Sequence, residues 1–339
     1  MRFSVIKRSP YLCLIIAACL VSLLALTQGA YAIAWNALFT SESHTIDRQI
    51  LTTVRLPRLL MAMLVGAALA ISGAMMQALF RNPLADPGLL GVSSGASVFV
   101  GILIVLNPVL HTIDLPLWAQ SYLQSVAAFL GAVLTCWLIF QLSKHKGKVS
   151  VLHLLLAGIA INALSGSATG LLTYLSNDEQ LRALTFWAMG SIGGARWEQV
   201  IVMASLVLPI IYIVCRQSGH LNLLLLGEEE ARYLGLNVEK FKRKLVVFVA
   251  ICVGVSVAFT GLIGFIGLMV PHLIRMLFGA DNRLVLPCSA LLGASLLAGA
   301  DTLARTIVIP AELPVGLVTS LLGGPFFLWL LLRNIRESH

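Results

Sequence analysis

The chain has 339 residues, of which 58% are hydrophobic and only 11% are charged, and its net charge is +8. A soluble domain carries about 25% charged residues, so this composition excludes an ordinary soluble protein and predicts an integral membrane protein. Each membrane-spanning helix needs about 20 apolar residues, and the strict alternation that a β-barrel strand requires is missing.

Taken in chain order, ten apolar stretches predict an all-α polytopic membrane protein of about ten transmembrane helices. The eighth stretch is short, and the sixth begins with a piece that glycines interrupt. Residues 1–34 also have features of a secretory signal, but a cleaved leader would leave an odd number of spans, so we expect a transmembrane helix there. The stretches are residues 11–34, 57–79, 88–107, 117–142, 150–175, 184–215, 243–262, 264–280, 284–304 and 315–332.

The distribution of Lys and Arg predicts the orientation of these spans. With a cytoplasmic N-terminus, seventeen basic residues fall in cytoplasmic segments, including Arg2, Lys7, Arg8 and Lys146, against six outside. Because cytoplasmic loops are enriched in Lys and Arg, both termini are expected to be cytoplasmic. The same bias explains most of the positive net charge, so no nucleic-acid partner is expected.

The stretch RNPLADPGLLG, residues 81–91, interrupts two apolar runs abruptly. Its Asn-Pro pair and second proline are typical of a tight cytoplasmic turn that ends one helix, and Asp86 is placed to cap the next. In the preceding span, small residues recur every four positions, which predicts close packing of that helix against its neighbours. They are Ala62, Gly66, Ala70, Ala74 and Ala78.

The usual motifs for nucleotide hydrolysis and zinc binding are missing. No phosphate-binding loop occurs, since the only Gly-Lys pair, Gly147-Lys148, is followed by Val149, and His-Glu-x-x-His is absent. Ionisable residues are rare within the spans, and His272 beside Pro271 is interpreted as a hydrogen-bonded structural residue. We therefore expect no catalytic residue, no metal site and no cofactor, and transport driven by another subunit.

The longest polar connection covers residues about 217–242 and contains short amphipathic helical pieces. Glu228 and two further glutamates follow Gly227, and acids at a helix start are favourable for the helix dipole. Tyr233 and Leu234 are expected on one face of this piece. Leucines beside acids in a short turn favour docking on a partner over a solvated loop.

Several long motifs in the sequence resemble those of a known family. They are RLPRLLMAMLVGAALAISGAMMQALFRNPLADPGLLGVSSGA, LNLLLLGEEEARYLG, GFIGLMVPHLIR, ADTLAR and ELPVGLVTSLLGGPFF. Together they resemble the permease subunit of type II ABC importers for iron-siderophore, haem and vitamin B12, from about residue 55 to 332. The resemblance implies one transmembrane permease domain over residues 1–339 in the bacterial inner membrane, with ten helices as in the vitamin B12 permease.

The resemblance also implies partners and roles for individual residues. The partners are a second copy of the chain, two ATP-binding subunits, a periplasmic substrate-binding protein and membrane lipid. Three arginines are implied to dock the binding protein: Arg55, Arg58 and Arg305. A cytoplasmic gate is implied at Asn82, Pro83 and Leu84, with residues 150–152 as the opposing segment. Coupling to the ATPase is implied for Leu226, Gly227, Glu228, Ala231, Leu234 and Gly235.

The segments at residues 154–197 and 227–238 are most similar to the haem permeases of Gram-negative bacteria. We therefore expect haem as the substrate, with ferric siderophore and cobalamin as alternatives within the same machinery. An ion-coupled secondary transporter is the alternative from another class of protein.

Overall fold

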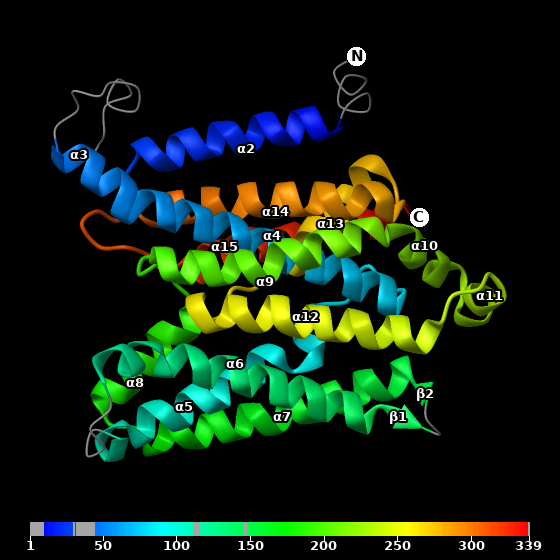
Figure 1. The fold of residues 1–339 in the computed structure, drawn as a ribbon, viewed down its shortest axis with the longest axis horizontal. Coiled ribbons are helices and arrows are strands. Elements are labelled where there is room, and N and C mark those ends of the chain that lie inside the picture. The colour runs from blue at the N-terminus through cyan, green and yellow to red at the C-terminus, as the bar shows by residue number, and fades with distance from the viewer. Residues whose placement is uncertain (1–9, 30, 32–44, 111–115, 146–147, 338–339) are drawn as a thin grey trace. The chain divides into compact units, whose positions relative to one another are not determined.

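The structure is a computed structural model that describes residues 10–29, 31, 45–110, 116–145 and 148–337 (Figure 1). Within these ranges the regular structure is helical, apart from a short antiparallel hairpin of β1 (Lys144–His145) and β2 (Lys148–Val149). The basic residues Arg2, Lys7, Arg8 and Lys146, which contribute to the predicted orientation, lie outside the described residues.

The expected number of apolar helices is confirmed in the described part of the chain. Eight helices are long and apolar enough to cross a membrane, and the two further apolar helices, in α5 and α13, are shorter. The helices that correspond to the predicted spans are α2 (Pro10–Thr27), α4 (Leu56–Phe80), α5 (Val92–Leu110), α6 (Leu117–Leu142), α7 (Val151–Leu175), α9 (Trp197–Arg216), α12 (Val238–Thr260), α13 (Ile266–Phe278), α14 (Asn282–Ala304) and α15 (Val315–Glu337).

In the described part of the chain, six short helical elements lie between these spans. They are α3 (Thr45–Ile50), the π-helical turn η2 (Leu51–Arg55), the 3-10 turn η3 (Pro87–Leu90), α8 (Asp178–Met189), α10 (Ser218–Leu226) and α11 (Glu228–Tyr233). The turn η2 continues directly into α4, so that the apolar helical stretch runs from residue 46 to 80.

The sixth predicted span, residues 184–215, is wrong in its first part. It divides into α8 (Asp178–Met189) and α9, and only α9 is long and apolar enough to cross a membrane. A capping box of Asn177 and Gln180 starts α8 earlier than predicted, and Gly190, at φ 69°, ends it. Hydropathy alone cannot locate these two boundaries, because both depend on local hydrogen bonds and backbone conformation.

The chain divides into two compact units. The first comprises residues 1–74, 191–216 and 263–339, and the second residues 75–190 and 217–262. In the first unit, α14 packs against α2, α9, α13 and α15. The small residues of α4 are buried, as predicted, and a Cβ atom at Gly66 or Gly73 would overlap the carbonyl oxygen of Gly293 or Gly267 respectively. Backbones therefore touch where the sequence has glycine.

In the second unit, α5 packs against α6, α7 and α8, and α12 packs against α5 and α6. A Cβ atom at Gly95 would overlap the carbonyl oxygen of Gly131, so α5 and α6 also approach at backbone distance. The start of α7 follows β2 directly, because Ser150 caps α7 by accepting from the backbone N–H of His153. This unit contains the turn after α4 and the pair of short helices α10 and α11.

Candidate gating, coupling and docking residues

The three arginines predicted to dock a binding protein lie close together in the first unit. Arg55 ends η2, Arg58 lies in the first turn of α4, and Arg305 follows the last residue of α14. The position of a Cβ atom on Gly29 is 3.3 Å from Nη2 of Arg55 and 3.6 Å from Nη1 of Arg305. The structure therefore brings together residues that are 250 positions apart in sequence, as expected from their common level in the predicted spans.

The side chains of these arginines are buried, which the sequence analysis did not anticipate. Arg55, Arg58 and Arg305 are only 4%, 7% and 7% exposed. Arg55 donates to the carbonyl oxygens of Leu26 and Tyr31, and Arg305 donates to that of Ala25. Two of the three guanidinium groups thus satisfy carbonyl groups at the end of α2, where a helix leaves its last carbonyls without partners.

Arg58 makes a network of ion pairs within the chain. Its Nε lies 2.9 Å from Oδ2 of Asp301, its Nη2 donates to Oδ1 of the same carboxylate at 2.9 Å, and its Nη1 lies 3.0 Å from Glu312. Asp301 is 4% exposed, whereas the Glu312 side chain is 49% exposed. A bidentate Arg–carboxylate pair has strong geometric specificity, so α4 is fixed against α14 at this point.

The predicted gate residues Asn82, Pro83 and Leu84 form the turn after α4. Arg81 has φ 50°, the side chain of Asn82 accepts from the N–H of Leu84 at 2.9 Å, and Leu84 is 53% exposed. The turn is therefore tight and leaves an apolar side chain uncovered within its unit.

The predicted helix cap at Asp86 is confirmed. Its Oδ1 accepts from the N–H of Gly88 at 2.7 Å and starts η3. Burial raises the pKa of the Asp86 carboxyl, and the hydrogen bond from Gly88 opposes that rise. The cap thus holds the chain between the gate turn and α5.

The predicted coupling residues lie on α10, α11 and the glycines beside them. Gly227 separates the two helices at φ 143°, and Gly235 follows α11 at φ 88°, so both adopt conformations that favour glycine. Ala231 is buried, and Leu226 and Leu234 are 63% and 61% exposed.

Tyr233, at 89% exposed, adds to the uncovered apolar residues of this segment. We call Leu226, Tyr233 and Leu234 the apolar coupling surface. The expected exposure of an apolar face beside acids is present.

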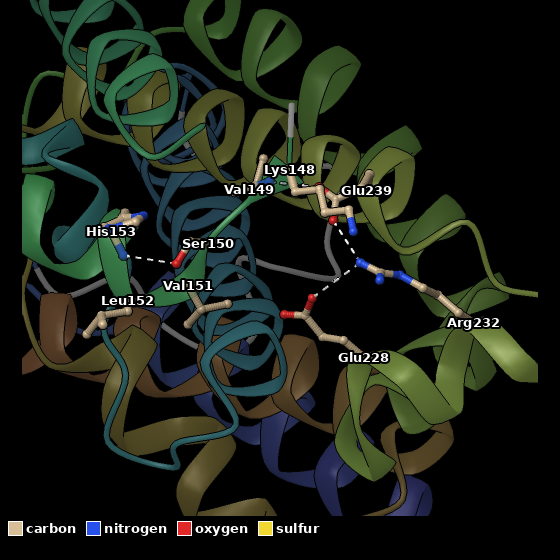
Figure 2. Close-up of a pocket in the computed structure, with 9 residues that line it drawn as sticks. All are labelled: Lys148, Val149, Ser150, Val151, Leu152, His153, Glu228, Arg232 and Glu239. Atoms are coloured by element: carbon tan, nitrogen blue, oxygen red, sulfur yellow. Dashed lines mark hydrogen bonds and ion pairs between the residues drawn. The ribbon is translucent and has the colours of Figure 1, made fainter. Parts of the chain in front are cut away.

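A pocket of about 540 Å³ is lined in part by residues of α11 (Figure 2). Figure 2 shows Glu239 beside Lys148 and Val149, and Glu228 and Arg232 across the pocket from residues 150–153, with dashed lines from Arg232 to both glutamates. Arg232 lies 3.2 Å from Glu239 and 3.9 Å from Glu228. The coupling helix α11 and the predicted second gate segment, residues 150–152, therefore line one pocket.

Lys242 was missed in the sequence, although it lies beside the same residues. It is 1% exposed, its Nζ is 2.6 Å from Oε2 of Glu228, and it donates to the carbonyl oxygen of Val149 at 2.9 Å. Its position in the basic run KFKRK suggested only a solvated helix start. One feature of the sequence could have indicated its burial. Lys242 lies four residues after Val238, so the two residues share a face of α12, and that face is buried.

In the described part of the chain, no group of three or more His, Cys, Asp or Glu residues could hold a metal ion. The interpretation of His272 as hydrogen-bonded is wrong: neither ring nitrogen has a hydrogen-bond partner among the described residues. Its ring instead packs edge-on against Phe326, with ring centroids 6.3 Å apart. Aromatic packing thus takes the place of the expected hydrogen bond.

A family model described as the FecCD transport family matches residues 14–333. The chain belongs to this family. The FecCD chain is 52% identical over 321 residues to the hemin transport system permease protein HmuU of Yersinia pestis, covering 95% of this chain and 94% of that protein. It is 42% identical over 300 residues to the vitamin B12 import system permease protein BtuC of Vibrio cholerae, covering 88% and 87%.

Among solved structures, the FecCD chain is similar to an inward-facing conformation of a metal-chelate type ABC transporter. The TM-score is 0.84 at 32% sequence identity, and the match covers 95% of this chain and 98% of that one. The family membership and this likeness agree with the resemblance found in the sequence motifs. They establish the polytopic fold and a multi-pass membrane protein of a transport family.

Proposed function

We propose that this protein is the permease subunit of an ABC importer that moves haem across the bacterial inner membrane by alternating access. The observation that carries this proposal is the 52% identity to a hemin permease over nearly the full length of both chains. The vitamin B12 permeases are less similar, at 41–46% identity. Ferric siderophore and cobalamin remain alternative substrates for the same machinery.

The chain itself is proposed to be non-catalytic, with ATP hydrolysis in a partner subunit. This is supported by its missing phosphate-binding loop and by its similarity to proteins named as permeases. The alternative of an ion-coupled carrier requires titratable groups along the path. Of the charged residues in the apolar helices, Arg58 of α4 and Asp301 of α14 are both buried and are paired with each other.

We assign the partners from the same reasoning. Two ATP-binding subunits are proposed to contact the apolar coupling surface, and the excess of Lys and Arg in the predicted cytoplasmic segments supports cytoplasmic termini. A second copy of the chain is proposed because only 11% of an 18-residue apolar segment of α7 is buried within one chain. Asn82, Pro83 and Leu84 are proposed to close the base of the path.

Docking of a periplasmic binding protein by Arg55, Arg58 and Arg305 stays a prediction. Because all three side chains are buried against groups of their own chain, direct pairing with a partner requires them to leave those contacts. Reversing Arg55 and Arg58 to Glu is still expected to weaken docking and its salt dependence. The measurement must include thermal unfolding of the free variant, so that loss of docking is separated from loss of the fold.

Reconstituted uptake tests the proposed function. The chain is placed in proteoliposomes with its ATPase subunit and binding protein, and uptake of haem, a ferric siderophore and cobalamin is compared with and without ATP. We expect ATP-dependent uptake of haem that an uncoupler leaves intact. Uptake without the ATPase subunit that collapses with an uncoupler would instead identify an ion-coupled carrier, and uptake of another substrate alone would replace haem.

Leu234→Asp tests the proposed coupling surface. Leu234 is 61% exposed in the chain, so a carboxylate there costs the fold little but places a charge in an apolar contact with the ATPase. We expect at least a tenfold loss of complex in a pull-down, with normal membrane insertion. Leu234→Met, which keeps an apolar side chain of similar volume, is the control, and wild-type assembly of the Asp variant contradicts the assignment.

A further inference from the structure

Lys242 is a charged residue with almost no contact with solvent. It lies in the second turn of α12 and is 1% exposed, whereas Lys244 on the same helix is half-buried and lies 5.4 Å from the centre of the Phe248 ring. A buried ammonium group requires compensating partners, because its transfer from water is costly. The identity of those partners therefore indicates what Lys242 does.

The ammonium group of Lys242 joins two segments that are far apart in sequence. Its Nζ is 2.6 Å from the carboxylate of Glu228, the first residue of α11, and 2.9 Å from the carbonyl oxygen of Val149, which it donates to. Glu239 lies 4.0 Å away, one turn earlier on α12. Lys242 thus connects α11 with the last residue of β2.

Val149 is held from α12 at both of its backbone polar groups. Its N–H donates to Oε2 of Glu239 at 2.9 Å, while its carbonyl oxygen accepts from Lys242. Val149 is paired with Lys144 in the β1–β2 register. The bonds to Glu239 and Lys242 satisfy its backbone N–H and carbonyl groups, so that no further strand is required to pair with them. Bonds to charged side chains are stronger than neutral ones, so this attachment is firm.

The residues after Val149 are those of the predicted second gate segment. Ser150 caps α7, Val151 begins the helix, and Leu152 is 62% exposed. No residue separates the anchored strand from this cap, so movement of Val149 must move the start of α7. At the α11 end of this connection, Arg232 adds two further ion pairs, 3.2 Å from Glu239 and 3.9 Å from Glu228.

We propose that Lys242 is a positioning residue that ties the coupling helix α11 to the start of α7, so that displacement of α11 is transmitted to residues 150–152. Glu228 and Glu239 are its two acidic partners in this link. The inference rests on the proposed function, because it requires an ATPase partner that moves α11. It deepens that function by naming the contact through which the movement reaches the gate.

Lys242→Met tests this link, since it keeps an unbranched side chain that is only one atom shorter and removes the charge and all three donors. The complex with the ATPase subunit and binding protein is reconstituted, and both ATP hydrolysis and substrate uptake are measured. We expect hydrolysis within about twofold of wild type and at least a fivefold fall in substrate molecules moved per ATP. Lys244→Met, which removes the same charge two residues later, is expected to match wild type.

Glu228→Gln is the second variant and keeps the test possible if Lys242→Met fails to fold. The change is isosteric, and the amide oxygen of Gln can still accept a hydrogen bond from Lys242. We expect a smaller fall in uptake per ATP, about twofold to threefold, in the complexes that assemble. Amide hydrogen exchange at residues 149–151 supplies a readout independent of transport, and we expect faster exchange in both variants.

The outcomes separate the inference from the function on which it rests. If the wild-type complex shows no ATP-dependent uptake of any tested substrate, the proposed function fails. If the wild type transports and both variants keep its uptake per ATP, the link does not transmit movement and the inference is overturned. Loss of assembly in Glu228→Gln, with the uptake per ATP of the assembled remainder unchanged, also overturns it, since Glu228 is then only structural.

Discussion

The helices α4 and α7 have the same length, 25 residues each, yet they have opposite surroundings within the chain. In an apolar segment of 18 residues within the stretch that contains α4, 83% of the residues are buried, whereas in the corresponding 18-residue segment of α7 only 11% are. Both helices carry glycines and alanines, and both are apolar enough to cross a membrane. Two helices of similar length and composition can therefore differ completely in position, one packed at the centre of the chain and the other largely uncovered by it.

The contacts of the two helices explain this difference. α4 touches neighbouring backbones at Gly66 and Gly73 and carries the Arg58–Asp301 pair. α7 is held chiefly at its first half, where a Cβ atom at Gly158 would overlap the carbonyl oxygen of Leu89 and the Asn162 side chain makes hydrogen bonds. Because apolar side chains gain nothing from leaving lipid, close contacts and polar bonds decide which helix is central.

Asp301→Ala is expected to cause the largest loss of stability, because it removes a contact that holds α4 in its buried position. The change leaves the buried guanidinium of Arg58 without its bidentate partner, and breaking a buried pair in this way costs about 3–5 kcal/mol. Thermal unfolding in detergent measures the loss. Glu312→Gln, at the half-exposed end of the same network, is the control and should cost at most about 1 kcal/mol; equal losses in the two variants would contradict the distinction.

Gly73→Ala is expected to destabilise the protein by about 3 kcal/mol. The added methyl group would overlap the carbonyl oxygen of Gly267, so α4 and α13 must move apart and lose their close contact. The denaturant or thermal stability of the purified variant measures this cost. A neutral result would mean that these two helices do not approach at backbone distance in the membrane.

Asn162→Ala is expected to cost about 1–2 kcal/mol, because it removes two side-chain hydrogen bonds between α7 and its neighbours. The Asn162 amide donates to the carbonyl oxygen of Gly88 at 3.1 Å and accepts from the hydroxyl of Ser94 at 2.6 Å. The matched control on α7 is Ser167→Ala, since the Ser167 hydroxyl bonds to the carbonyl oxygen of Ala163 in its own helix. If both variants unfold at the wild-type temperature, α7 is not anchored through Asn162.

Gly170→Ala is expected to have the smallest effect, and it should raise the stability of the chain rather than lower it. Among the described residues nothing lies within 4 Å of a Cβ atom at Gly170, so the variant should gain up to about 1 kcal/mol from better helix propensity. The unfolding temperature of the single chain measures this gain. A fall in the proportion of dimer would show instead that the second copy packs closely on this face of α7, whereas a loss of stability in the single chain would contradict its open surroundings.

Sequence patterns predicted those features that depend on neighbouring residues. The cap at Asp86, the turn at residues 81–87 and the small-residue stripe of α4 were identified, because turn chemistry and helical spacing are local. The division of the sixth span was only partly anticipated, since the Asn177 capping box lies before the apolar stretch. The contacts of Arg58 and Lys242 were not predicted.

The sequence by itself determined that the chain crosses a membrane about ten times and belongs with transport permeases, because hydrophobic length and long motifs are carried by contiguous residues. Only the tertiary structure decided which charges are buried. Arg58 meets Asp301 across 243 positions, and Lys242 meets the backbone of Val149 across 93. Such pairs leave no periodic signal, because a buried charge is stabilised by whichever partner the fold brings within hydrogen-bond distance.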